Sequence, residues 1–243
     1  MRETAFLTIS GIGKRKSMQD FATEGYNATC GFRWFVLCDG IGGQPKGDVA
    51  ARLTADVLHL YFSGLDVPVD ASNINAICEN GLIRIGNAFE DSIEGGDGAA
   101  NMGCTLCCLL MTPSSCYVLW AGDSRLFQIR RQKLVYENIP HTFIFDLYRK
   151  GDFTKEEAEN GSLNYLTGAI SEEVEYIRWE LAELDIREND RVIICTDGVW
   201  GSMEYADFVS LIEKCRLSDV KHHLDPFLKE YGDDNYWAYL VGF

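Results

Sequence analysis

Four short stretches of this 243-residue chain each join an apolar run to an aspartate at a glycine or another tight turn. The four acids are Asp39, Asp123, Asp197 and Asp234. Apolar runs of this length and composition are typical of strands that are buried on at least one face. If these strand ends meet at one edge, the carboxylates form an all-oxygen site of the kind that Mg²⁺ or Mn²⁺ prefers.

Each aspartate taken alone is more simply explained as a turn residue. The segment after Asp39 is different, because a hairpin needs one or two glycines and this segment has Gly40, Gly42, Gly43 and Gly47. It leads from a strand into a helix, as phosphate-binding loops often do. It lacks the Gly-Lys-Ser/Thr of a Walker loop and the Gly-x-Gly-x-x-Gly spacing of a dinucleotide-binding loop. The segment therefore favours a ligand site without identifying the ligand.

Further short motifs follow one another along almost the whole chain. In order they are Arg15-Lys-Ser-Met-Gln-Asp20, Asp39-Gly-Ile-Gly-Gly43, Gly47-Asp-Val-Ala-Ala51, Gly103-Cys-Thr105, Ala121-Gly-Asp-Ser-Arg125, Ile139-Pro-His-Thr142, Leu166-Thr-Gly-Ala169, Thr196-Asp-Gly-Val-Trp200 and Asp234-Asn235. Together they resemble the metal-dependent serine/threonine protein phosphatases of type 2C, the PPM family, in its bacterial-type form with a single catalytic domain. Each motif is weak singly, but in register they make a strong resemblance. We therefore expect one catalytic domain over residues 1–243.

The resemblance implies an α+β fold, a four-layer α-β-β-α sandwich in which helices flank two central antiparallel sheets. Apolar spacing predicts a helix through residues 49–60, with Asp48 placed to cap its start. A second helix is expected through residues 74–89, weakened by Gly81 and Gly86. Strand-like runs dominate residues 103–135, helices are expected near 205–215 and 220–230, and a strand follows Asp234. In the family, the metal centre lies at one end of the sandwich, between the sheets.

Charge and cysteine content restrict the partners and the compartment. The formal net charge is −15, which argues against nucleic acid or an anionic membrane as the main partner. The longest apolar runs are far too short to span a bilayer, and no targeting pattern is seen.

The odd total of nine cysteines does not suit a disulfide framework. Strand alternation would point the thiols of Cys104 and Cys107 to opposite faces. We expect a soluble, cytoplasmic monomer.

The resemblance also assigns ligands to two Mn²⁺ or Mg²⁺ ions. Asp39 would bridge the two ions, Asp197 and Asp234 would bind the first, and the carbonyl oxygen of Gly40 would bind the second. Such a pair can lower the pKa of a shared water and clamp phosphoryl oxygens, which suits hydrolysis of a phosphate monoester. Asp39 is therefore a predicted catalytic residue as well as a metal ligand.

Three further residues complete the expected site. Arg15 matches the family's phosphate-binding arginine, because its planar guanidinium can hold two phosphoryl oxygens. It is the second predicted catalytic residue and is expected to contact no metal. Asp20 would orient waters on the metals from the second shell. Asp123 could help to hold a weak third metal, but Gly201 stands where many members place the second acid of that site.

Several positions depart from the family pattern. Gln19 stands where many members have a metal-binding Glu, and Ile41 stands where eukaryotic members often have a His that is proposed as the general acid.

His141 is treated as a structural residue, because a lone His at a strand end is more often hydrogen-bonded than catalytic. Residues 142–163 correspond to the family's variable flap, whose acidic stretch at 156–160 could equally be a solvated helix face.

The expected function is a metal-dependent protein phosphatase that acts on phosphoserine or phosphothreonine in a protein, opposite a cognate kinase. Two alternatives remain open. One is a pseudophosphatase that binds or regulates, which Gln19 and Gly201 favour. The other is a hydrolase of a small phosphorylated metabolite, since the sequence has no substrate-docking motif. The intact set of metal ligands favours the enzyme, because the chemistry depends on it.

Overall fold

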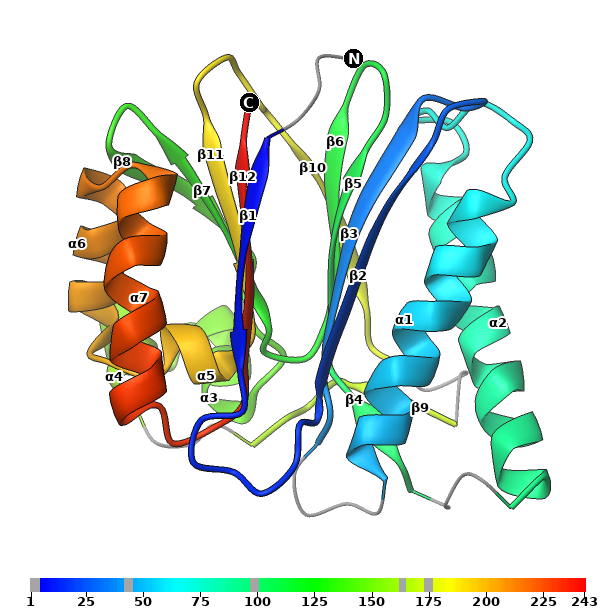
Figure 1. Ribbon diagram of the computed structural model, residues 1–243, viewed down its shortest axis with the longest axis horizontal. Coiled ribbons are helices and arrows are strands. Elements are labelled where there is room, and N and C mark those ends of the chain that lie inside the picture. Colours follow the sequence, from blue (N-terminus) through cyan, green and yellow to red (C-terminus); the bar gives the residue numbers. More distant parts are fainter. Residues whose placement is uncertain (1–4, 42–45, 97–100, 162–164, 173–176) are drawn as a thin grey trace.

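A computed structural model describes residues 5–41, 46–96, 101–161, 165–172 and 177–243. Two five-stranded antiparallel sheets pack face to face, and helices cover their outer faces (Figure 1). The predicted α+β sandwich of four layers is confirmed. The first sheet has the order β1 (Phe6–Gly11), β12 (Tyr236–Gly242), β11 (Arg191–Cys195), β7 (Arg125–Arg130), β8 (Lys133–Glu137). The second has the order β10 (Glu180–Leu184), β6 (Cys116–Ala121), β5 (Leu106–Met111), β3 (Phe32–Asp39), β2 (Asp20–Asn27).

The helices divide between the two outer layers and one projecting segment. The second sheet is covered by α1 (Gly47–Ser63) and α2 (Ile74–Glu94), and the first by α6 (Tyr205–Lys214) and α7 (Leu217–Tyr231) (Figure 1). The remaining elements are α3 (Phe143–Lys150), α4 (Lys155–Asn160), α5 (Asp197–Trp200) and the paired short strands β4 (Gly103–Cys104) and β9 (Ile170–Ser171).

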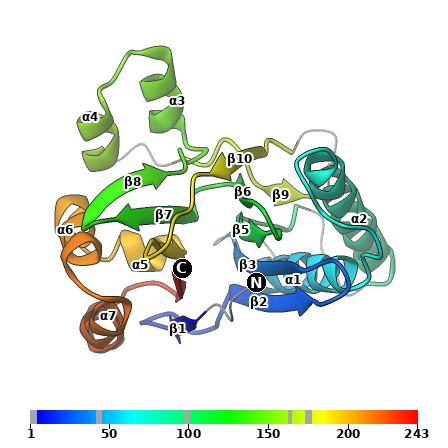
Figure 2. The same ribbon diagram turned by 90° about the horizontal axis from the view of Figure 1, so that it is seen from above.

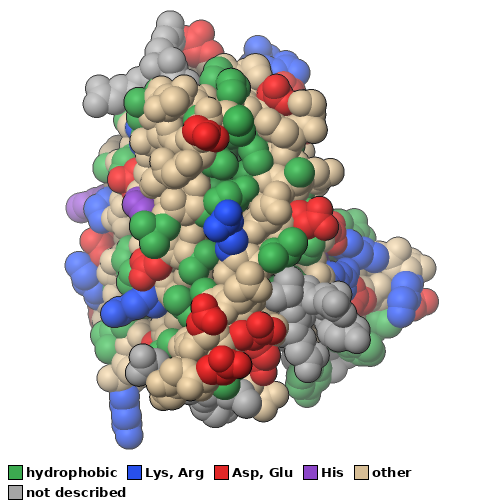
Figure 3. Space-filling view, turned by 90° about the vertical axis from the view of Figure 1, so that its right-hand side faces the viewer, with side chains coloured by type: hydrophobic (Ala, Val, Ile, Leu, Met, Phe, Trp, Pro, Cys, Tyr) green, Lys and Arg blue, Asp and Glu red, His purple; other side chains and the backbone are tan. Residues whose placement is uncertain are grey.

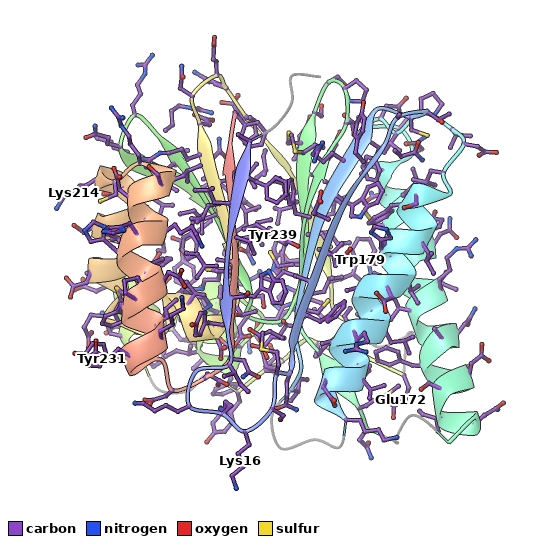
Figure 4. The ribbon with its side chains drawn as sticks, viewed as in Figure 1. Lys16, Glu172, Trp179, Lys214, Tyr231 and Tyr239 are labelled. Atoms are coloured by element: carbon purple, nitrogen blue, oxygen red, sulfur yellow. The ribbon has the colours of Figure 1, made fainter. Side chains whose placement is uncertain are left out.

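Three apolar cores hold these layers together. The middle one lies between the sheets, where the Phe35 ring packs edge-on against Phe6 and Tyr239 at centroid distances of 5.1 and 5.2 Å. Tyr239 is labelled in this layer in Figure 4. Side chains alternate along a strand, so Phe35 of β3 faces the other sheet whereas its neighbour Val36 faces α1. Cys104 of β4 and Cys107 of β5 lie in different cores, as expected, although they belong to different strands, and all nine cysteines are free.

The start of α1 differs from the prediction. Lys46 is the N-cap, with a left-handed backbone at φ 59°, and no side chain caps the helix. Asp48 lies in the first turn instead, so the prediction that it caps the helix was wrong. Its carboxylate is still favoured there by the partial positive charge of the helix N-terminus. The second predicted helix is longer than expected, because its glycines Gly81 and Gly86 are buried and its packing outweighs their low propensity.

The outer surface of α1 and α2 mixes scattered apolar side chains with acidic and basic ones (Figure 3). Leu60 and Ile83 are examples of exposed apolar residues on these helices. In the described part of the chain, no helix is long and apolar enough to cross a membrane.

The flap stands out from the body of the molecule beside β8 and is built from α3 and α4 (Figure 2); its last predicted residues, 162 and 163, lie outside the described ones. The flap is tied to the first sheet by Arg125, a fully buried residue of β7. The guanidinium donates a hydrogen bond of 2.9 Å to Glu159 and lies 4.3 Å from the ring centroid of Trp200. The acidic stretch at 156–160 is therefore solvated only in part, because Glu159 points inward.

Candidate metal centre

Five aspartates from both sheets lie at one end of the sandwich, the lower end in Figure 1. Asp20 begins β2 and Asp39 ends β3, and the two residues are paired directly across these strands. Asp123 precedes β7, Asp197 follows β11 as the first residue of α5, and Asp234 precedes β12. The strand ends therefore gather the predicted acids at one edge, as the sequence suggested.

The acids repel one another strongly. Burial raises the pKa of Asp39 well above its usual value, and the charges of Asp197 and Asp20 raise it further. Burial and the charge of Asp197 together raise the pKa of Asp20 and of Asp123 to about 7. Such a group of carboxylates is poorly stable at neutral pH unless a cation compensates it.

We expect the metal-free protein to lose stability as the pH rises. Asp20 and Asp123 have folded-state pKa values of about 7, above the unfolded value, so the folded state binds more protons than the unfolded state between roughly pH 4 and 7. The free energy of unfolding should therefore fall by roughly 2–4 kcal/mol between pH 5 and 8 in chelator. Thermal unfolding measures this, and Mn²⁺ should restore most of the loss at pH 8. A melting temperature that does not fall over this range would contradict the prediction.

Asp20 is held by a hydrogen bond that joins the two sheets beneath the site. The Thr196 hydroxyl donates to Asp20 Oδ2 at 2.9 Å and accepts from the backbone N–H of Trp237 at 3.0 Å. Thr196 follows β11 of the first sheet, whereas Asp20 belongs to the second. The other oxygen of Asp20 is buried without a hydrogen-bond partner, and so is Oδ1 of Asp197. Buried carboxylate oxygens of this kind suit a hard cation and its waters.

Two glycines allow the backbone segments of the site to approach closely. A Cβ on Gly198 would lie 1.9 Å from the backbone oxygen of Asn235, so a larger residue would force apart the segments that carry Asp197 and Asp234. A Cβ on Gly40 would lie 2.4 Å from the backbone oxygen of Gly47. The Gly40 carbonyl, which is the one predicted to bind metal, thus lies in a tightly packed segment.

Asn235 anchors the loop that carries Arg15. Its side-chain oxygen accepts from the backbone N–H of Gln19 at 2.7 Å, and its amide donates to the backbone oxygen of Ile12 at 2.8 Å. Asn235 and Thr196 were both part of predicted motifs, but neither was predicted to anchor the site. Each stands next to a predicted ligand, which is the signal that could have found them.

Arg15 makes a contact that the sequence analysis did not expect. Its guanidinium donates to Asp234 Oδ2 at 2.6 Å, and this bond raises the pKa of Arg15. Among the described residues, no three acidic, histidine or cysteine side chains are arranged to hold a metal ion by themselves. The Arg15–Asp234 pair accounts for one of these acids, because Asp234 directs its Oδ2 to the guanidinium. Arg15 side-chain exposure is 50%, so it is free to exchange this partner for another anion.

The positions that depart from the family pattern lie around the same end. Gln19 lies beside Gly47 at the start of α1, and Gly201 ends the short helix α5. The indole N–H of Trp200 donates to the backbone oxygen of Asp123 at 3.2 Å, which fixes Asp123 close to α5. Residues 42–45 of the glycine segment lie outside the described residues.

His141 has the contacts of a structural residue. It is fully buried, its Nδ1 accepts from the backbone N–H of Gly122 at 3.3 Å, and its Nε2 lies 3.0 Å from a Glu180 oxygen. Burial lowers its pKa to about 4, so the ring is neutral at pH 7 and carries its hydrogen on Nε2. It supports the turn that presents Asp123.

A groove opens beside Asp197 and Asp234. Flap residues 159–161 form one wall, and residues 200–205, from the end of α5 to the start of α6, form another. Of the five aspartates, Asp197 and Asp234 line this groove.

Comparisons with known proteins agree with this arrangement. Residues 10–229 match the family described as protein phosphatase 2C. Protein phosphatase PhpP of Streptococcus pneumoniae is 26% identical over 242 residues, 98% of this chain and 96% of its own. The structure of serine/threonine phosphatase Stp1 from Staphylococcus aureus has a TM-score of 0.83 at 24% identity, covering 100% of this chain and 95% of its own. The catalytic domain of PstP, crystallised with two manganese ions, has a TM-score of 0.78 at 21% identity, covering 98% and 97%. The chain therefore belongs to the protein phosphatase 2C family.

Proposed function

We propose that this chain is a Mn²⁺- or Mg²⁺-dependent protein serine/threonine phosphatase with a binuclear centre. The observation that carries the proposal is the group of five aspartates at one end of the sandwich, two of which keep a buried oxygen without a partner. Family membership supports the reaction class, and the manganese ions in the PstP structure support the choice of cofactor.

The proposed ligands are those that the family motifs select. Asp39 would bridge two ions, Asp197 and Asp234 would bind one of them, and the Gly40 carbonyl would bind the other. When bound, two such ions neutralise phosphoryl oxygens and lower the pKa of a water. Asp123 would take part in a weak third site, for which Gly201 supplies no second carboxylate.

The side chains of the protein would position substrate and water. Arg15 would leave Asp234 and hold two phosphoryl oxygens with its planar guanidinium. Asp20, which receives the Thr196 hydrogen bond on one oxygen, keeps its other oxygen to accept a hydrogen bond from water. His141 would support the Asp123 turn without touching substrate.

The proposed substrate is a phosphoserine or phosphothreonine in a protein, and the proposed setting is a cytoplasmic monomer that opposes a cognate kinase. The name of PhpP as a protein phosphatase supports the substrate class. The competing functions are a pseudophosphatase and a hydrolase of a small metabolite.

Assays of phosphate release distinguish these functions. Purified full chain should hydrolyse p-nitrophenyl phosphate only when Mn²⁺ or Mg²⁺ is added, and should release phosphate from phosphoserine and phosphothreonine peptides. A pseudophosphatase would show no turnover with either kind of substrate. A metabolite hydrolase would act on p-nitrophenyl phosphate and leave the peptides intact.

A further inference from the structure

A second cleft lies at the far end of the first sheet from the aspartates. Strands β7, β11 and β12 each carry an aspartate of the candidate centre at one end and residues of this cleft at the other. Asp197 and Arg191, for example, are separated by the whole of β11, roughly 20 Å along an extended strand. Figure 4 shows the two ends, with Lys214 labelled at the upper left and Lys16, in the loop between β1 and β2, labelled at the bottom. We call this second cleft the distal cleft.

The distal cleft is basic although the protein is strongly acidic. Six of the 22 lysines and arginines in the chain line it, against a net charge of −15. They come from the end of β7 and the turn after it, from the start of β11 and the segment before it, and from the end of α6 and the turn after it. They are Arg130, Arg131, Arg187, Arg191, Lys214 and Arg216. Basic side chains that gather around one cleft create a local field that favours anions.

Acidic neighbours compensate only part of this charge. Arg130 forms ion pairs with Asp185 and Asp190 at 3.1 and 2.8 Å, and Arg187 with Asp185 at 2.7 Å. Glu188 also lines the cleft. These contacts explain two of the six cations as a structural network.

The other four cations have no carboxylate partner among the described residues. Arg131 and Arg216 are exposed, and neither lies within ion-pair distance of an acid in the part of the chain that the structure describes. Lys214 donates to the Ser210 hydroxyl at 2.7 Å, and Arg191 donates only to backbone oxygens, those of Cys215 and Glu213. These four side chains therefore place uncompensated positive charge around one hollow.

The N-terminus of α7 adds to the same field. Its N-cap, Arg216, has an extended backbone, and no side chain caps the helix. Leu217 and Ser218 of the first turn line the cleft, so the positive end of a 15-residue helix opens there. Backbone N–H groups and guanidinium forks are together the donors that phosphate oxygens prefer.

We propose that the distal cleft binds a phosphate group, either as free orthophosphate or on a phosphoserine or phosphothreonine of a protein. A phosphate dianion neutralises four cations that lack a carboxylate partner better than a single carboxylate does. Its oxygens can also accept hydrogen bonds from several donors at once. The cleft is remote from the aspartates, so binding there does not depend on the metal centre. A phosphate bound here would leave the groove beside Asp197 free for substrate.

Calorimetric titration of the full chain in chelator, at constant ionic strength, tests the proposal. The probes are orthophosphate, acetate, a phosphoserine peptide and its unphosphorylated form. The test variant is Arg131→Ser with Arg216→Ser, and the charge-matched control is Lys150→Ser with Lys229→Ser, which alters exposed lysines outside the cleft. Arg15→Ala removes the phosphate contact expected at the metal centre.

We expect saturable binding of orthophosphate or phosphopeptide to the wild type, to Arg15→Ala and to the control. The Arg131/Arg216 variant should bind roughly 10-fold more weakly or worse, because each lost guanidinium removes a charge-assisted contact, and its hydrolysis of p-nitrophenyl phosphate should not change. Orthophosphate that binds as tightly as the phosphopeptide identifies free phosphate as the ligand, whereas tighter peptide binding identifies a phosphoprotein. Any of four results would overturn the proposal. They are no saturable binding to the wild type, binding of acetate or unphosphorylated peptide as tight as that of the phosphorylated probes, loss of phosphate binding in Arg15→Ala, and unchanged binding in the Arg131/Arg216 variant.

Discussion

Asp39→Asn should abolish Mn²⁺-dependent phosphate release while the protein stays folded. A ligand that bridges two cations must supply negative charge to both, which an amide cannot do. We expect kcat to fall by more than the roughly 100-fold that loss of an outer-shell partner costs in a metal site. Because repulsion from Asp197 and Asp20 helps to raise the pKa of Asp39, removal of its charge should also raise the melting temperature of the metal-free protein at pH 8.

The matched control for this change is Asp233→Asn. Asp233 is an exposed acid at the same end of the molecule and pairs with Lys14 at 2.7 Å, so its loss alters the local charge without removing a proposed ligand. Kinetics, circular dichroism and thermal unfolding of both variants are the measurements. If Asp39→Asn retains substantial Mn²⁺-dependent turnover, the binuclear assignment is wrong, whatever happens to stability.

Most of the fold could be predicted because its motifs sit where strands end. An apolar run followed by Asp-Gly predicts both a buried strand and its boundary, as with Asp39 at the end of β3 and Asp197 just after β11. The start of α1 could not be predicted in this way. The backbone there turns at Lys46 in a left-handed conformation, and the sequence offered Asp48 as a more usual cap.

The gathering of the acids could be predicted, but their supports could not. Thr196 forms a hydrogen bond with Asp20, 176 residues away in the sequence, and Asn235 forms one with Gln19, 216 residues away. Such contacts depend on how the two sheets meet, which no local pattern reports. Arg125 shows the same limit, because burial against Trp200 and an ion pair with Glu159 of the flap follow from the assembled fold.

The distal cleft was invisible in the sequence for a related reason. Its six basic residues come from three separate turns, between positions 130 and 216. They form no basic run, and the net charge of −15 conceals them. The antiparallel order β12-β11-β7-β8 brings the β7–β8 turn and the segment before β11 to one end, and residues 214–218 at the α6–α7 turn line the same cleft.

Arg15→Ala should raise KM for a phosphorylated peptide strongly, and it should not weaken Mn²⁺ binding. The guanidinium is proposed to hold two phosphoryl oxygens, so its loss should cost roughly 10- to 100-fold in kcat/KM, as for charge-assisted contacts. In the metal-free protein the same group holds Asp234 at 2.6 Å. Because a metal ion must displace it from this carboxylate, the variant should bind Mn²⁺ as tightly as the wild type or more tightly. Calorimetric Mn²⁺ titration and peptide kinetics measure the two effects, with Lys14→Ala as the control from the same loop. Weaker Mn²⁺ binding in Arg15→Ala alone would mean that Arg15 supports the metal site, and that the ion pair with Asp234 orients a ligand instead of competing for it.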